Sequence, residues 1–316
     1  MGDSESIQTV CPVCDFTEAH FLSSYRGHHA DFSKCSIVSC DQCKMVFVHP
    51  MPDEHFLYEY NQSYFSNAHG GISTDLLTVA FHSAINLVRV LYVENFLKNG
   101  AGVIKSVLEI GPGPGHFARH WLQRHNETVS YTAVDSDTSC YDILAGMGVS
   151  TYTDLKQIPE QQNFDLVVIS HVLEHTADPQ VFIDDCTKLL SPGGILFIEV
   201  PCNDHQHKNT IEPHLLFFDK KPMELLLVKQ GFRIGKLSYH GSTIVDLQKP
   251  ISFLKKMYSK GKNFLYRRGV RFPFSVAEAG MEGMIDPLER AVVKPFKAHK
   301  EQTEPSWWLR AIAIKN

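Results

Sequence analysis

Three glycines at alternate positions follow an apolar run and an acid in the segment Val-Leu-Glu-Ile-Gly-Pro-Gly-Pro-Gly, residues 107–115. Gly111, Gly113 and Gly115 can adopt positive φ angles and let the backbone approach a ligand, and the two intervening prolines stiffen the turn. The apolar spacing after residue 115 predicts a helix whose N-terminal N–H groups lie beside that turn. Asp135 ends the next apolar run, where a second parallel strand would bring a carboxylate to a ribose. These residues predict a binding site for a nucleoside cofactor.

Two pairs of cysteines near the N-terminus have the spacing of metal ligands. Cys11-Pro-Val-Cys14 and Cys40-Asp-Gln-Cys43 each offer two thiolates from one tight turn, so that four sulfurs can surround a zinc ion. Four thiolates leave no open coordination position, which predicts a structural metal that stabilises a segment too short for a core of its own. The remaining cysteines lack such partners and are interpreted as small buried apolar groups: Cys35, Cys140, Cys186 and Cys202.

The order of the motifs between about residues 103 and 235 resembles that of the class I S-adenosylmethionine-dependent methyltransferases. The resemblance is carried by Glu109 and the glycines that follow it, by Asp135, by Phe164-Asp-Leu-Val-Val-Ile-Ser-His-Val-Leu-Glu-His175, and by Leu190-Ser-Pro-Gly-Gly-Ile-Leu-Phe-Ile-Glu199. A nicotinamide-dependent oxidoreductase is the first alternative. The pattern G-x-G-x-G in place of G-x-G-x-x-G counts against that alternative.

The N-terminal region resembles a branch of the same superfamily that acts in natural-product and sugar biosynthesis. A two-knuckle zinc unit is followed by Met45-Val-Phe-Val-His-Pro-Met-Pro52 and by a tyrosine-rich helix. The resemblance implies a zinc-binding module at 1–52, a helical cap at 53–100, and a cofactor-binding domain at 101–316 with an insert at 245–303. Deoxysugar C-methyltransferases carry a further large C-terminal domain for which the chain is too short. Their sugar substrate and carbon methylation are therefore not carried over.

The expected fold is α/β, a seven-stranded Rossmann-like methyltransferase sheet with the zinc module and helical cap at its N-terminal side. Strands are predicted near 106–111, 130–135, 149–152, 164–170, 194–200, 234–240 and 308–314. Helices are predicted near 75–99, 115–125, 137–147, 178–190 and 220–230, from apolar positions at helical intervals and from the family order.

In an open parallel sheet, ligands bind outside the carboxyl ends of the strands. The resemblance implies that Asp135 accepts the ribose hydroxyls, that Asp154 receives the adenine amino group and that Tyr64 in the cap touches the cofactor. Glu109 is expected near the methionine end. Three more residues at strand ends complete the predicted cofactor site: Ser136, for which a helix N-cap is the alternative, Ser170 and His171.

Methyl transfer requires an acceptor aligned with the methyl group and, where the acceptor bears a proton, a base to remove it. His205, His207 and His214 follow the fifth strand, in the loop that faces the acceptor in the resembled fold, and are the candidate bases. His175 is a further candidate, although its place in a Val-Leu-Glu-His signature favours a role in shaping the cofactor pocket. Solvated loop histidines are the alternative interpretation.

Composition bounds the choice of acceptor and location. A formal charge of −5 argues against a general nucleic-acid binder, and the sequence shows no apolar run of the length that spans a bilayer, so no membrane partner and a cytoplasmic location are expected.

Eight basic residues and no acid occur from Lys249 to Arg271, with aromatic residues between them. They are interpreted as the solvated face of a helix that ends at Gly261 and packs its apolar side, or as a field that attracts an anionic acceptor. The predicted function is therefore methylation of a small, anionic metabolite at oxygen, nitrogen or carbon in a biosynthetic pathway. An RNA methyltransferase and a non-catalytic cofactor-binding module are the alternatives, and the oligomeric state is open.

Overall fold

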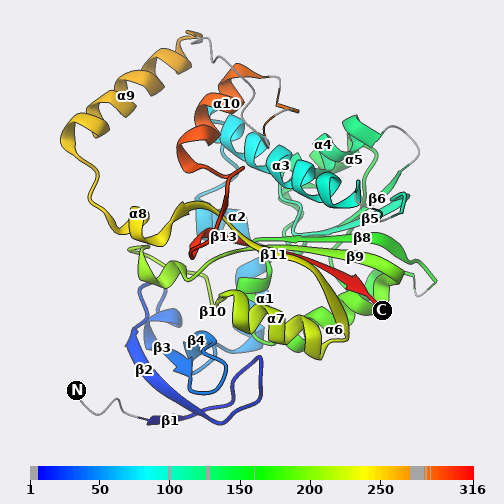
Figure 1. The fold of residues 1–316 in the computed structure, drawn as a ribbon, viewed down its shortest axis with the longest axis vertical. Coiled ribbons are helices and arrows are strands. Elements are labelled where there is room, and N and C mark those ends of the chain that lie inside the picture. The colour runs from blue at the N-terminus through cyan, green and yellow to red at the C-terminus, as the bar shows by residue number, and fades with distance from the viewer. Residues whose placement is uncertain are drawn as a thin grey trace.

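The computed structural model describes residues 6–98, 100, 102–125, 129–159, 161–270, 281, 283–284 and 286–316. Within these ranges, eight strands form a central sheet in the order β12-β11-β13-β9-β8-β5-β6-β7 (Figure 1). Strands β7, β6, β5, β8 and β9 pair in parallel, and β13, β11 and β12 pair antiparallel to their neighbours. The bounds are β5 Ser106–Ile110, β6 Ser130–Val134, β7 Ser150–Tyr152, β8 Phe164–Ser170, β9 Leu190–Pro201, β11 Phe232–Thr243, β12 Glu301–Gln302 and β13 Ser306–Lys315.

Helices cover both faces of this sheet, which explains why its central strands are apolar without interruption. Val168 and Phe197 pack toward one face, while their chain neighbours Val167 and Leu196 pack toward the other. The first face carries α3 Leu76–Leu97, α4 His116–His125 and α5 Tyr141–Ala145, and the second carries α6 Pro179–Leu189 and α7 Lys220–Lys229 (Figure 1). The α/β Rossmann-like architecture predicted from the sequence is confirmed.

Helix α3 is long and apolar enough to cross a membrane by its composition, and it is the one described helix that is. Most of it is buried inside the domain, against α4 and the sheet on one side and α10 Pro287–Val293 on the other. It is therefore the core helix of this domain.

The N-terminal residues form a second, antiparallel sheet of five strands among the described residues, in the order β1-β2-β3-β4-β10. Its strands are β1 Ser6–Gln8, β2 Glu18–Ser24, β3 Ser36–Cys40, β4 Val46–His49 and β10 Leu216–Phe217. Strand β10 comes from the loop after β9, so one strand of this sheet is supplied by the central domain. Leu215 beside it accepts a hydrogen bond from the Val48 N–H at 3.0 Å and donates its own N–H to the Glu174 carbonyl at 2.8 Å.

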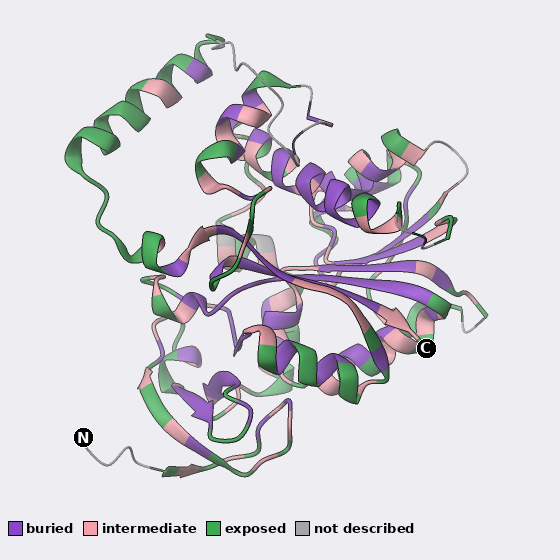
Figure 2. Ribbon diagram, in the orientation of Figure 1, coloured by how far each residue is buried: buried purple, intermediate pink, exposed green. Residues whose placement is uncertain are grey.

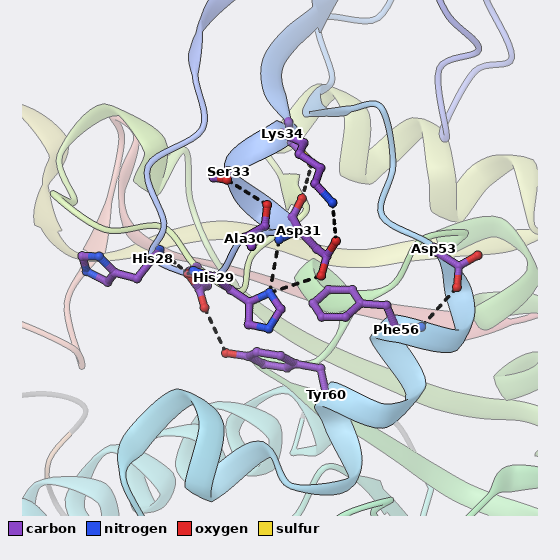
Figure 3. A network of polar contacts seen from close by, with 11 residues as sticks. His28, His29, Ala30, Asp31, Ser33, Lys34, Asp53, Phe56 and Tyr60 are labelled. Atoms are coloured by element: carbon purple, nitrogen blue, oxygen red, sulfur yellow. Dashed lines mark hydrogen bonds and ion pairs between the residues drawn. The ribbon is translucent and has the colours of Figure 1, made fainter.

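The cap consists of α1 Glu54–Gln62 and α2 Tyr64–His69, and it is attached to the N-terminal sheet by aromatic and polar contacts (Figure 3). Asp53 caps α1 by accepting hydrogen bonds from two backbone N–H groups of its first turn. Phe56 and Tyr60 of α1 pack against His29 from the loop before the short turn η1 Phe32–Lys34. Glu212 accepts hydrogen bonds from the His29 N–H at 3.0 Å and from the Tyr60 hydroxyl at 3.4 Å. These contacts set the position of α2, which begins at Tyr64.

The insert between β11 and β13 departs most from expectation. It contains α8 Ile244–Gln248, α9 Phe253–Arg267, α10 and the turn η6 Lys294–Phe296. Helix α9 continues through Gly261, and its apolar side does not pack: Leu254 is 78% exposed and Tyr258 is 72% exposed (Figure 2). Both predictions for this segment, a stop at Gly261 and a packed apolar face, are wrong. Arg271 lies outside the described residues.

The other predicted elements lie within a few residues of their expected bounds. The helix predicted at 137–147 is shorter: a turn η2 Thr138–Cys140 leads into α5, which ends before Gly146 and Gly148. Gly148 has a φ of 77°, a conformation that no helix residue adopts. Cys35, Cys140, Cys186 and Cys202 are all buried, as predicted.

Candidate active site

A cavity of about 810 Å³ lies at the carboxyl ends of β5, β6 and β8, where the fold predicts a ligand site. Its volume is within the range usual for sites that hold a cofactor or a small molecule. The lining comes from the cap, from the strand ends and the loops that follow them, and from the middle and end of α6. It includes Asn61, Tyr64, Gly111, Gly113, Asp135, Ser136, Asp154, Lys156, His171, Val172, His175, Asp185 and Lys188.

The glycine turn brings bare backbone to one wall of the cavity. Gly111 and Gly113 have φ angles of 68° and 52° and both line the cavity. A Cβ at Gly111 would lie 2.4 Å from the Val172 Cγ2 atom, so a larger residue would displace the opposite wall. Gly115 does not line the cavity. Its φ is 70°, and a Cβ there would collide with Leu144 and Met147 of the α5 region, so its role is close packing of α4 against α5.

Asp135 follows the last residue of β6 and lines the cavity. Its carboxylate accepts a hydrogen bond from the Asp137 N–H at 3.0 Å, and its carbonyl accepts one from the Tyr141 hydroxyl at 2.8 Å. Burial of the carboxylate raises its pKa from 3.8 to about 6. An acid held in place and poorly solvated before a ligand arrives is suited to accept hydrogen bonds from ribose hydroxyls.

Four of the other predicted cofactor residues reach the cavity, and Ser170 and Glu109 do not. Ser136, Asp154, Tyr64 and His171 line it. Asp154 also accepts the Lys156 N–H at 2.8 Å, so it caps the turn η3 Leu155–Gln157 as well as facing the cavity. Ser170 ends β8 without being part of the lining.

Glu109 lies beneath the cavity, where it is 3% exposed. It accepts a hydrogen bond from the Tyr131 hydroxyl at 2.7 Å, and burial raises its pKa to about 7. The position of Glu109 on a central strand places it in the sheet between α-helical layers, apart from the cavity lining.

A buried ion cluster that the sequence did not indicate lies next to His171. Glu199 at the end of β9 accepts a hydrogen bond from Arg89 Nε at 2.7 Å and another from Arg310. Burial alone would raise the pKa of Glu199, but the two guanidinium groups hold it well below its ordinary value. Glu199 and Glu174 each lie 3.3 Å from a ring nitrogen of His171, whose pKa these acids hold above its ordinary value in spite of burial. The available signals were charged residues inside apolar runs: Arg89 in α3, Glu199 in β9 and Arg310 in β13.

Three aromatic side chains lie in contact at the end of the cavity nearest the cap. The ring of Tyr64 meets that of His175 with centroids 5.5 Å apart, and His175 meets His214 at 4.9 Å. His214 is buried and His175 is mostly covered, and this burial lowers the pKa of His175 to about 4. The Nδ1 atom of His214 lies 2.7 Å from a carboxylate oxygen of Asp204, in the turn η5 Asp204–Gln206. Burial opposes ionisation of Asp204, but His214 and Lys208 hold its pKa far below its ordinary value.

The four candidate bases differ in their partners and in their burial. An acid on one ring nitrogen orients His214 and leaves its other nitrogen available to accept a proton. His205 instead packs edge-on against Phe217 with centroids 5.1 Å apart, and burial lowers its pKa to about 4. His207 packs against Trp307, and burial lowers its pKa too. The alternative interpretation, solvated loop histidines, does not hold for these three, and none of the three lines the cavity, whereas His175 does. Asp204 was missed because its partner is ten residues away, across an irregular loop.

The four N-terminal cysteines converge as predicted. The sulfurs of Cys11, Cys14, Cys40 and Cys43 all lie within 4.8 Å of one another. The Cys11–Cys43 and Cys14–Cys40 sulfur distances are 3.6 and 3.5 Å. Tetrahedral zinc with Zn–S bonds of about 2.3 Å would place its sulfurs about 3.8 Å apart, so this cluster has the dimensions of a metal site.

Comparison with known proteins assigns the central domain. A family model described as a methyltransferase domain matches residues 87–236. This part of the central domain is similar to S-adenosylmethionine-dependent methyltransferase domains. The match includes the glycine turn, Asp135, β8 and β9 and excludes the four cysteines.

Curated relatives share parts of this methyltransferase domain. It is 31% identical over 121 residues to a ubiquinone biosynthesis O-methyltransferase of Coxiella burnetii (strain RSA 493 / Nine Mile phase I), an alignment that covers 36% of the chain and 49% of the relative. It is 24% identical over 205 residues to the protein of the same name from Idiomarina loihiensis, which covers 53% of the chain and 84% of the relative. The chain thus spans about half the length of the Coxiella relative.

A solved structure has the same fold over most of the chain. The plantazolicin methyltransferase BamL, in complex with a triazolic desmethylPZN analogue and SAH, superposes with a TM-score of 0.51 at 14% sequence identity. The alignment covers 83% of this chain and 99% of that one. The likeness at this identity establishes the methyltransferase fold.

Proposed function

We propose that the protein transfers the methyl group of S-adenosylmethionine to a small metabolite, with His214 as the base. The observation that carries the proposal is the cavity that joins the glycine turn and Asp135 at one end to Tyr64 and His175 at the other, with the Asp204–His214 pair directly behind His175.

In this proposal, different residues of the cavity wall bind different parts of the cofactor. Gly111 and Gly113 let the cofactor lie against bare backbone, and Asp135 accepts the hydroxyls of its ribose. Asp154 receives the adenine amino group, and Tyr64 closes over the reacting end. When bound, the cofactor supplies an activated methyl group, so that the protein must mainly align the acceptor.

The proton of the acceptor passes to the free ring nitrogen of His214 in the proposed reaction. The Asp204 carboxylate, 2.7 Å from the other ring nitrogen Nδ1, would hold the ring in one tautomer. His175, whose pKa is lowered to about 4 by burial, stays neutral at physiological pH and forms part of the wall against which the acceptor lies.

The basic residues that predicted an anionic acceptor and that the structure describes, from Lys249 to Arg268, lie in and beside α9 and do not line the cavity. The proposal therefore specifies a small acceptor without assigning its charge or the atom that is methylated. The biosynthetic role is likewise proposed by analogy with the names of the relatives. A cytoplasmic location is proposed from the eight cysteines, none of which is in a disulfide.

A structural zinc ion in the four-cysteine cluster belongs to the same proposal. The four sulfurs would complete its coordination, so the metal would stabilise the N-terminal sheet and take no part in the reaction.

The proposal is tested by calorimetric titration of the zinc-loaded protein with S-adenosylmethionine, its demethylated product and NAD. Binding of the first two and not of NAD is expected. A screen of small acceptors with a labelled methyl group follows, using His214→Asn, His175→Asn and His205→Asn. We expect turnover to fall about 10²–10⁴-fold in the first variant with cofactor affinity unchanged, and little change in the third. Binding of NAD alone would refute the cofactor assignment. Full turnover by the His214 variant would exclude a histidine base at this position.

A further inference from the structure

Helix α9 separates apolar from basic residues around its axis. At 100° per residue, its aromatic and aliphatic side chains occupy an arc of about 140°, and its lysines occupy the opposite side. The apolar arc consists of Phe253, Leu254, Met257, Tyr258, Phe264 and Leu265, and the basic side consists of Lys255, Lys256, Lys260, Lys262 and Arg267.

Most of α9 is exposed (Figure 2), and this includes every residue of the apolar arc. Phe253 is 74% exposed, Leu254 78% and Phe264 55%. Among the described residues, the helix is anchored to the domain at its C-terminal turn, where Tyr266 is buried in a cluster with Leu77 and Leu288. Figure 1 shows α9 projecting from the body of the protein beside α10. Single exposed apolar residues are ordinary, but a contiguous exposed stripe of this kind marks a contact surface.

We propose that α9 is a membrane-docking helix that binds anionic lipid bilayers. Its apolar arc would lie among the acyl chains just below the headgroups, and its lysines would lie at the level of the lipid phosphates. Residues 247–277 contain no acid, so no carboxylate of this segment would repel an anionic surface.

Two other partners satisfy only one side of the helix. An RNA would contact the lysines and leave the phenylalanines and leucine in water. A second copy of the chain, packed through the apolar arc, would cover those residues but bring two sets of lysines close together, where they repel each other. An anionic bilayer is the partner that buries the apolar arc and pairs the basic side at once.

Docking through α9 would turn the acceptor side of the domain toward the lipid. Helix α8, which leads into α9, contacts the turn η5, and the Gln248 side chain donates a hydrogen bond to the Gln206 carbonyl at 3.3 Å. The end of α8, which leads into α9, therefore lies next to the loop that holds Asp204. This proposal replaces the expectation of no membrane partner, which rested on the absence of a spanning segment.

The test is co-flotation of the full zinc-loaded protein with vesicles of phosphatidylcholine alone or mixed with phosphatidylglycerol, at low and high salt. The wild type should float with the anionic vesicles only, and less at high salt. Leu254→Ser with Phe264→Ser should weaken binding at least tenfold, because two anchoring side chains are lost. Lys255→Glu with Lys256→Glu should weaken it by at least about 25-fold, near fivefold for each basic residue.

Matched controls change equally exposed residues elsewhere. Val228→Ser on α7, where the valine is 55% exposed, controls for the loss of apolar surface, and Lys98→Glu with Lys105→Glu controls for net charge. Both should float like the wild type, and cofactor affinity measured by calorimetry should be the same in all variants. Equal flotation with neutral vesicles, or flotation unaffected by the α9 variants, would overturn the proposal. So would sedimentation as a dimer that Leu254→Ser dissolves, or tighter binding to RNA than to vesicles.

Discussion

Asp135 is predicted to lower the stability of the cofactor-free protein in order to bind its ligand, and Asp135→Asn measures that cost. Burial raises the pKa of Asp135 from 3.8 to about 6, so the folded protein binds this proton more tightly than the unfolded chain. The stability that this proton contributes is present at low pH and is lost as the pH rises through 6. The pKa of Asp135 is about two higher in the folded than in the unfolded protein. This difference lowers the free energy of unfolding by about 3 kcal/mol at pH 8 and by about half of that at pH 5.

Asparagine keeps the size of the side chain and can still accept the Asp137 N–H, but it carries no charge to desolvate. Asp135→Asn should therefore be more stable than the wild type in urea unfolding without cofactor, by an amount that grows between pH 5 and pH 8 toward about 3 kcal/mol. Its affinity for S-adenosylmethionine should fall about 10- to 100-fold, because hydrogen bonds to a charged acceptor are lost. Asp142→Asn on α5, an exposed acid, is the control. A variant that is less stable than the wild type at pH 8, or that binds the cofactor equally well, would refute the reasoning.

Three further results are expected. Gly111→Ala should weaken cofactor binding at least tenfold, and Val172→Ala added to it should restore the part due to the 2.4 Å contact while leaving the cost of the positive φ, about 1–2 kcal/mol; no recovery in the calorimetric affinity would count against the contact. Cys40→Ser should reduce bound zinc, measured by metal analysis, and lower the melting temperature, whereas Cys35→Ser, outside the cluster, should retain a full complement of metal. Glu199→Ala should destabilise the protein by about 3–5 kcal/mol in urea unfolding, since it leaves two buried guanidinium groups unpaired; a loss below 1 kcal/mol would show that water reaches them.

The parts of the site that could be predicted from the sequence are local to strand ends. Gly111 and Asp135 each stand directly after an apolar strand and Gly113 lies two residues after Gly111, and parallel strands bring their carboxyl ends to one edge. The four cysteines were predictable because each pair lies within one tight turn. Gly115 was not separable from its neighbours, because spacing alone does not say which glycine faces the ligand and which faces a helix.

The remaining parts depend on contacts between distant segments. The pairing of Asp204 with His214 depends on how an irregular loop returns to the N-terminal sheet, and nothing in the loop's residues states that path. The outward face of α9 was missed for another reason. Helical periodicity shows that a helix has an apolar side, but it does not show whether the protein itself covers that side.

The strand β10 has a consequence for how the protein is made. It pairs with β4, whose partner residues Val46 and Phe47 leave the ribosome about 170 residues before Leu216 and Phe217. The N-terminal sheet must therefore wait, with its edge unpaired, until most of the methyltransferase domain has been synthesised. Metal bound early by the four cysteines would hold the nascent sheet together during that interval. Because Leu215 joins Val48 to the Glu174 carbonyl, the loop that carries His214 would then close in the same step that completes the N-terminal sheet. In zinc-starved cells the protein should accordingly be degraded during or soon after its synthesis.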